Sequence, residues 1–164
     1  MGLDIHAAAF GDWVPKFVRV SNRIAGIIRE PTVAEIGAHR GLLAVSALRV
    51  ENLELFVHHV SPGAALRQPS DVEVAYHDAS QSNVRADLST IVEAARTNSA
   101  SAYRLHQLFR MLGPFTDANG RCGRVLRMWQ LMRGSRQDLA EVARLDLLDV
   151  HHPLHSDVVG RSIM

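Results

Sequence analysis

Residues 113–124 gather the side-chain types that bind phosphate groups and a divalent metal ion: Gly-Pro-Phe-Thr-Asp-Ala-Asn-Gly-Arg-Cys-Gly-Arg. Apolar residues at helical spacing precede and follow this stretch, so we expect a tight loop that leads into a second helix. Free backbone N–H groups and the helix dipole favour anions at such a helix start. Arg121 and Arg124 lie in its first turn, and Asp117 and Asn119 lie just before it. The stretch therefore predicts a site for phosphates and a divalent metal.

Each of these residues has a chemical reason to be there and a plainer alternative. The planar guanidinium of arginine matches phosphate oxygens. Mg²⁺ prefers a carboxylate together with phosphate oxygens and water, which makes Asp117 the candidate metal ligand. Asp117 and Asn119 could instead only cap the following helix, since such residues are common at that position. The two arginines beside them favour phosphate binding.

The composition is that of a soluble, single-domain globular protein. The chain has 164 residues, of which 47% are hydrophobic and 21% charged, and its net charge is +1. A balance this close to neutral argues against a broad surface for nucleic acid or membrane, and 5% aromatic residues argue against base stacking. No apolar run approaches the length of a membrane span, and Cys122 has no disulfide partner. We therefore expect a cytoplasmic protein.

Hydrophobic periodicity predicts an all-α architecture around a central helix–loop–helix. Thr32 is a candidate N-cap with Glu35 as its capping-box partner. Later helices have candidate caps at Asn52, at Asn83, and at either Ser99 or Ser101. Alternating apolar residues within 62–82 predict a small β-hairpin flap, the only expected β structure. The expected helices cover residues 13–30, 32–49, 53–60, 84–97 and 120–133, with one that begins at residue 99 or 101 and ends at 112, and a short one from 135. We expect one domain over residues 1–164, with an N-terminal helix at about 12–30, a core at about 32–135 and a helical tail at 136–164.

The central stretch resembles the signature of the Fic (Fido) family, His-Pro-Phe-x-Asp/Glu-Gly-Asn-Gly-Arg-x-x-Arg. The matching residues are Pro114, Phe115, Asp117, Asn119, Gly120, Arg121 and Arg124. Ala118 stands where glycine is usual, and Gly113 stands where the family has its catalytic histidine. The helix 106–112 and the segment 62–67 also resemble the family, so the resemblance covers roughly residues 20–135.

This resemblance implies transfer of AMP from ATP to a hydroxyl of a target protein. It implies ATP and Mg²⁺ as cofactors, with Asp117 as the metal ligand. The implied nucleotide-binding residues are Asn119, Gly120, Arg121, Gly123 and Arg124. A glycine cannot take a proton from the attacking hydroxyl, which is work worth roughly 10²–10⁴-fold in rate. With Gly113 at the position of the general base, we expect a Fic-type adenylyltransferase that is inactive or strongly impaired.

Two alternatives to an impaired enzyme stay open. The chain is either a non-catalytic nucleotide-binding or protein-interaction module on a Fic scaffold, or a relative with a different phosphotransfer reaction. Whether Gly113 is natural or was introduced to tame a toxic protein is open too. Ser21-x-x-x-Ala25-Gly26 resembles the family's inhibitory motif, with Ala25 in place of the glutamate that blocks the γ-phosphate. This predicts that Arg124 is free to bind that phosphate.

The resemblance also implies partners. A target protein would dock as an added strand at the flap, residues about 70–80. Family members often pair, so a homodimer is a further expectation, and delivery to another cell as an effector is an alternative to a cytoplasmic role. Nucleic acid and membrane are not expected as partners.

Overall fold

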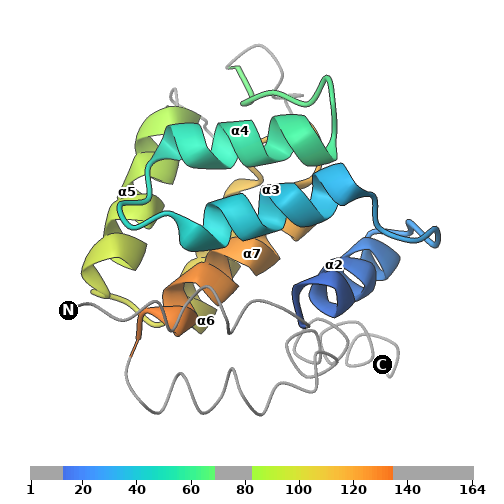
Figure 1. The fold of residues 1–164 in the computed structure, drawn as a ribbon. Helices are drawn as coiled ribbons and strands as arrows, with labels where there is room; N and C mark the ends of the chain where they lie inside the picture. Colours follow the sequence, from blue (N-terminus) through green and yellow to red (C-terminus); the bar gives the residue numbers. More distant parts are fainter. Residues whose placement is uncertain (1–12, 69–82, 135–164) are drawn as a thin grey trace, which may run out of the picture.

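Six α-helices form the part of the chain that the computed structural model describes, residues 13–68 and 83–134. They are α2 (Trp13–Ile24), α3 (Val33–Ala44), α4 (Val50–Val60), α5 (Val84–Thr97), α6 (Ala102–Leu112) and α7 (Asn119–Met132). Helices α3 and α4 lie side by side, α7 runs behind α3, and α5 and α2 flank them on opposite sides (Figure 1). The all-α prediction is confirmed. No helix among the described residues is long and apolar enough to cross a membrane.

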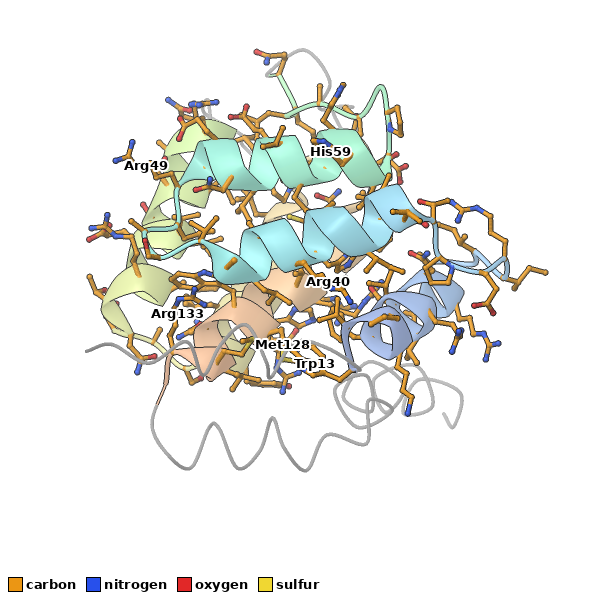
Figure 2. The ribbon with its side chains drawn as sticks, viewed as in Figure 1. Trp13, Arg40, Arg49, His59, Met128 and Arg133 are labelled. Carbon is orange, nitrogen blue, oxygen red and sulfur yellow. The ribbon has the colours of Figure 1, made fainter. Side chains whose placement is uncertain are left out.

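Helix α7 is the central element, and its side chains are buried continuously from Arg121 to Leu131. A helix that is buried on every side must be enclosed by its neighbours, and α2, α3, α4 and α6 all contact it. Trp129, 1% exposed, donates from its indole N–H to the Val45 carbonyl at 2.8 Å. The Arg133 guanidinium lies 4.3 Å from the ring centre of Trp129, where α7 meets the end of α3 (Figure 2). These contacts fix the C-terminal end of α7 against α3.

Local capping residues set the helix starts as the sequence predicts. The Thr32 hydroxyl accepts from the Glu35 backbone N–H, and the Glu35 carboxylate accepts from the Thr32 backbone N–H, which completes the predicted capping box. Asn83 caps α5 and Ser101 caps α6 through their side-chain oxygens. The predicted bounds of α5 and α7 therefore agree with the structure to within a residue, and α6 starts after Ser101, the later of its two candidate caps.

Two helix ends differ from prediction. Helix α2 stops at Ile24 rather than Glu30, because Gly26 adopts φ +80° and the Ile27 N–H donates back to the Asn22 carbonyl at 2.9 Å. Helix α3 ends at Ala44, before an extended Val45, instead of continuing to residue 49.

The predicted cap at Asn52 is wrong. Helix α4 starts at Val50, and Asn52 lies inside its first turn. Its side-chain oxygen accepts from the Arg49 backbone N–H at 2.8 Å.

The predicted β-hairpin flap is not supported. The described residues contain no strand, only an isolated antiparallel bridge between Leu66 and Phe115. The flap residues, about 70–80, lie outside the described residues, as does the helical tail predicted from residue 135. What the structure does show is that the segment before the flap is joined to the loop after α6.

Candidate functional site

The loop between α6 and α7 is built on two left-handed residues. Gly113 ends α6 with φ +51° and ψ +58°, and its N–H donates to the Phe109 carbonyl at 2.9 Å. Ala118 precedes α7 with φ +64°, a conformation that disfavours any residue with a Cβ. Glycine, the residue usual at this position in the Fic signature, would adopt it without strain. Gly113 and Ala118 therefore set the path of the loop between α6 and α7.

Two sets of hydrogen bonds hold the loop in place. The Asn119 side chain accepts from the Phe115 N–H at 2.8 Å and donates to the Phe115 carbonyl at 2.7 Å. From the other side, Arg67 N–H donates to the Pro114 carbonyl and Thr116 N–H to the Ala65 carbonyl. Phe115 itself is fully buried, as an anchor should be. Asn119 therefore shapes the loop, and its side chain is not a cap of α7.

A cavity of about 520 Å³ lies where this loop, the start of α7 and the end of α2 meet. The first N–H groups of α7 have no acceptor within the helix, so this wall favours anions. Ile24, Ala25 and Ile27, at and just after the end of α2, line the cavity as well. The lining residues are Ile24, Ala25, Ile27, Thr116, Asp117, Ala118, Asn119, Gly120, Arg121 and Arg124. Five of the seven predicted site residues thus line one cavity, together with Ala25.

Arg121 is held by the protein at one end of its guanidinium. Nη1 donates to the Val60 carbonyl at 3.0 Å and lies 3.6 Å from the Glu35 carboxylate. The residue is 5% exposed, and burial lowers the pKa of its guanidinium. Its Nε is buried and has no hydrogen-bond partner among the described residues. A buried N–H without a partner needs an acceptor, and because Arg121 lines the cavity, a phosphate oxygen bound there could supply one.

Arg124 is not free, contrary to the prediction from the missing glutamate. Its Nε donates to the Ser21 hydroxyl at 2.9 Å and its Nη2 to the Ser21 carbonyl at 2.7 Å. It is 3% exposed, and burial lowers its pKa to about 10, so it stays charged at neutral pH. Ala25 lines the same cavity, but the partner of Arg124 is Ser21.

Asp117 is exposed at the cavity edge, and its carboxylate accepts from the Ser61 hydroxyl. That bond and one from the Ala118 backbone N–H hold the pKa of Asp117 below its usual value, so the carboxylate is charged. No group of three or more His, Cys, Asp or Glu residues is placed to hold a metal within residues 13–68 and 83–134. A single carboxylate still fits Mg²⁺, which takes most of its ligands from phosphate and water. Asp117 would hold such an ion beside the phosphates.

The two glycines of α7 serve different neighbours. A Cβ on Gly120 would lie 3.1 Å from Arg124 Nη1, so this glycine makes room for the guanidinium within the cavity. A Cβ on Gly123 would lie 3.1 Å from Phe109 and 3.4 Å from His106, both on α6. Gly123 therefore serves the packing of α6 against α7 and does not line the cavity.

No described histidine stands in for the one missing at position 113. His106 packs against Gly123 at 3% exposure, and burial lowers its pKa to about 4. His39 is fully buried between Phe17 and Phe56, and burial lowers its pKa to about 4 as well. Neither ring lines the cavity. None of the described histidines is therefore placed to act as a base in the cavity.

Sequence reasoning did not identify three residues that hold the site. Ser61 contacts Asp117 from a position 56 residues earlier, Val60 contacts Arg121, and Glu35 had been given only a capping role. No local pattern marks the first two, because their contacts depend on how α4 packs against α7. The capping-box pattern marks Glu35 as a structural residue at a helix start, but it does not indicate the contact with Arg121.

Comparison with known proteins adds no identity. No family model, no curated protein and no solved structure matches this chain.

Proposed function

We propose that this protein binds a nucleotide with Mg²⁺ in the cavity at the start of α7, as a Fic-type scaffold that lacks its catalytic base. The observation that carries the proposal is the cavity of about 520 Å³ in which Asp117, Arg121 and Arg124 surround a helix N-terminus. The unpartnered Nε of Arg121 supports an anionic ligand in particular. The volume of this cavity is within the range usual for sites that bind small molecules.

On this scaffold the chain's residues would divide the work of phosphate transfer. Asp117 would hold Mg²⁺, which supplies neutralisation of phosphate charge. The α7 backbone N–H groups and Arg121 would hold phosphate oxygens and stabilise charge that develops on them. At position 113 nothing removes the proton from an attacking hydroxyl, so AMP transfer would be slow or absent.

A second candidate, a non-catalytic nucleotide-binding module, is favoured by the backbone of Gly113. Its left-handed conformation at the end of α6 is one that glycine adopts most easily. A chain that no longer needs a histidine there would gain stability from this glycine. The two candidates share the binding site. They differ in whether a histidine introduced at position 113 would allow AMP transfer.

Calorimetry with ATP, with and without MgCl₂, tests the binding site. We expect Mg²⁺ to increase the affinity for ATP. Asp117→Asn should abolish this increase, because the asparagine side chain is uncharged. Asp87→Asn is the matched control, since Asp87 is exposed in the first turn of α5, away from the cavity. Absence of any ATP binding by the unmodified protein would rule out the proposed function.

Transfer of label from α-labelled ATP, to the protein itself or to a lysate, then separates the two candidates. Gly113→His should restore transfer if the scaffold is an impaired adenylyltransferase. Binding that persists while transfer stays at background would identify the non-catalytic module.

A further inference from the structure

Glu35 is buried far more deeply than its capping role requires. It is the third residue of α3, and its carboxylate accepts from the Thr32 backbone N–H at 2.8 Å. A capping glutamate at a helix start ordinarily remains in contact with water, because its partner is a surface backbone group. Glu35 is 2% exposed. The remaining contacts of this carboxylate account for the difference.

The Glu35 carboxylate joins three separate parts of the fold. Arg29, in the segment between α2 and α3, donates to both carboxylate oxygens at 2.9 and 3.1 Å. Asn22 of α2 donates from its amide at 3.3 Å. Arg121 of α7 lies 3.6 Å away, and both members of this pair are almost fully buried. Burial acts to raise the pKa of Glu35, but the bonds from Arg29 and Thr32 outweigh it and lower the pKa to about 2.

These contacts determine which edge of Arg121 is left for a ligand. Val60 and Glu35 both lie at Nη1, so that end of the guanidinium is fixed to the protein. Nε, on another edge of the same rigid plane, has no partner among the described residues. Without the Glu35 carboxylate, Nη1 would keep only the neutral Val60 carbonyl, and the opposite charge that remains near Arg121 is Asp117, which lies at the cavity edge. The guanidinium would then be drawn away from its present position, toward that edge or toward water.

We propose that Glu35 is a positioning residue of the anion cavity, which holds Arg121 by Nη1 so that its Nε edge is presented to a ligand phosphate. This inference rests on the proposed nucleotide site. On this inference Glu35, which belongs to α3 and lies outside residues 113–124, helps to set the affinity of the site for phosphate.

The test compares two variants that both break the Arg29–Glu35 pair. Glu35→Gln removes the charge that holds Arg121, whereas Arg29→Gln leaves the contact between Glu35 and Arg121 intact. Affinities for ATP–Mg²⁺ and for pyrophosphate are measured by calorimetry at a temperature where both variants are folded by circular dichroism. We expect a loss of about fivefold or more for Glu35→Gln and a change of less than about twofold for Arg29→Gln.

The sign of the change is informative, because Glu35 is itself an anion near the cavity. If it only competed with phosphate for Arg121, its neutralisation would tighten binding, and that result would overturn the proposal. If Glu35→Gln melts too early, Glu35→Asp replaces it. That change keeps the charge and the cap but draws the carboxylate back from Arg121. An affinity loss of about threefold is expected there, and full affinity would count against the proposal.

A double-mutant cycle distinguishes positioning from a general structural role. In an Arg121→Gln background, Glu35→Gln should change the dissociation constant by less than about twofold, since Glu35 acts through Arg121. An equal loss in both backgrounds would mean that Glu35 only maintains the fold. Failure of the unmodified protein to bind either ligand would instead refute the nucleotide site itself, and the inference with it.

Discussion

Introducing histidine at position 113 tests both the backbone of the loop and the chemistry proposed for the site. Gly113 has φ +51°, where residues with a Cβ pay about 1–2 kcal/mol, although histidine is among those that tolerate it best. A Cβ built there meets only the Arg110 carbonyl at 3.9 Å and Asn119 Nδ2 at 4.0 Å, which are ordinary contacts. Backbone strain is therefore the only expected cost, about 1 kcal/mol, and it should lower the melting temperature by roughly 2–4 °C.

The matched control is Gly113→Ala, which carries the same backbone strain without an imidazole. Thermal melts followed by circular dichroism should show both variants destabilised to the same small extent. If the proposed impaired adenylyltransferase is correct, transfer of labelled AMP should appear in the histidine variant alone. A histidine variant that is several kcal/mol less stable than the alanine variant would show that the loop has no room for the ring. An alanine variant as stable as the original would contradict the left-handed conformation itself.

Four further changes test individual contacts, each followed by urea unfolding. Ala118→Gly should stabilise the protein by about 0.5–1 kcal/mol because it relieves left-handed strain; no gain would argue against that backbone. Ser21→Ala should cost about 1–3 kcal/mol, since it leaves Nε of buried Arg124 unpaired; a neutral effect would mean that this contact is dispensable. Gly123→Ala should cost about 1–3 kcal/mol, because its Cβ would lie 3.1 Å from a phenylalanine ring of α6; unchanged stability would mean that the two helices separate readily. Burial lowers the pKa of His39 to about 4 in the folded protein. Between pH 6.5 and 4 its imidazole is therefore protonated in the unfolded chain and neutral in the folded one. Stability should then fall by up to roughly 1.4 kcal/mol per pH unit from pH 6.5 toward 4, and His39→Gln should remove that part of the slope.

Local patterns in the sequence predict most of the helices correctly. The caps at Thr32, Asn83 and Ser101 act through contacts only three residues along the chain, so the sequence shows them directly. The early end of α2 was missed although Gly26 carries the signal, because apolar spacing continues past it to Ile27. Prediction fails here where two local signals compete.

The sequence predicts which residues form the candidate site better than it predicts the contacts that they make. The stretch around Asp117 and Arg121 lies within one segment of the chain, so its pattern can be recognised without a fold. The hydrogen bond between Arg124 and Ser21 joins positions 103 residues apart, and no local sequence pattern predicts it. The same holds for Glu35, whose capping role is visible in the sequence while its contact with α7 arises only from packing.

The distance along the chain between Ser21 and Arg124 also bears on how the molecule is assembled. Helices α6 and α7 are joined by a short loop and can pair early, whereas closing a 103-residue span costs about 4 kcal/mol of chain entropy by logarithmic scaling. At synthesis rates of about 5–20 residues per second, α2 would emerge from the ribosome roughly 5–20 s before its partner arginine. During that interval the apolar face of Val14, Phe17 and Val18 has no α7 to pack against. The wall of the cavity next to α2 can therefore be completed only after α7 is made, and a newly made chain depends on α7 to finish covering α2.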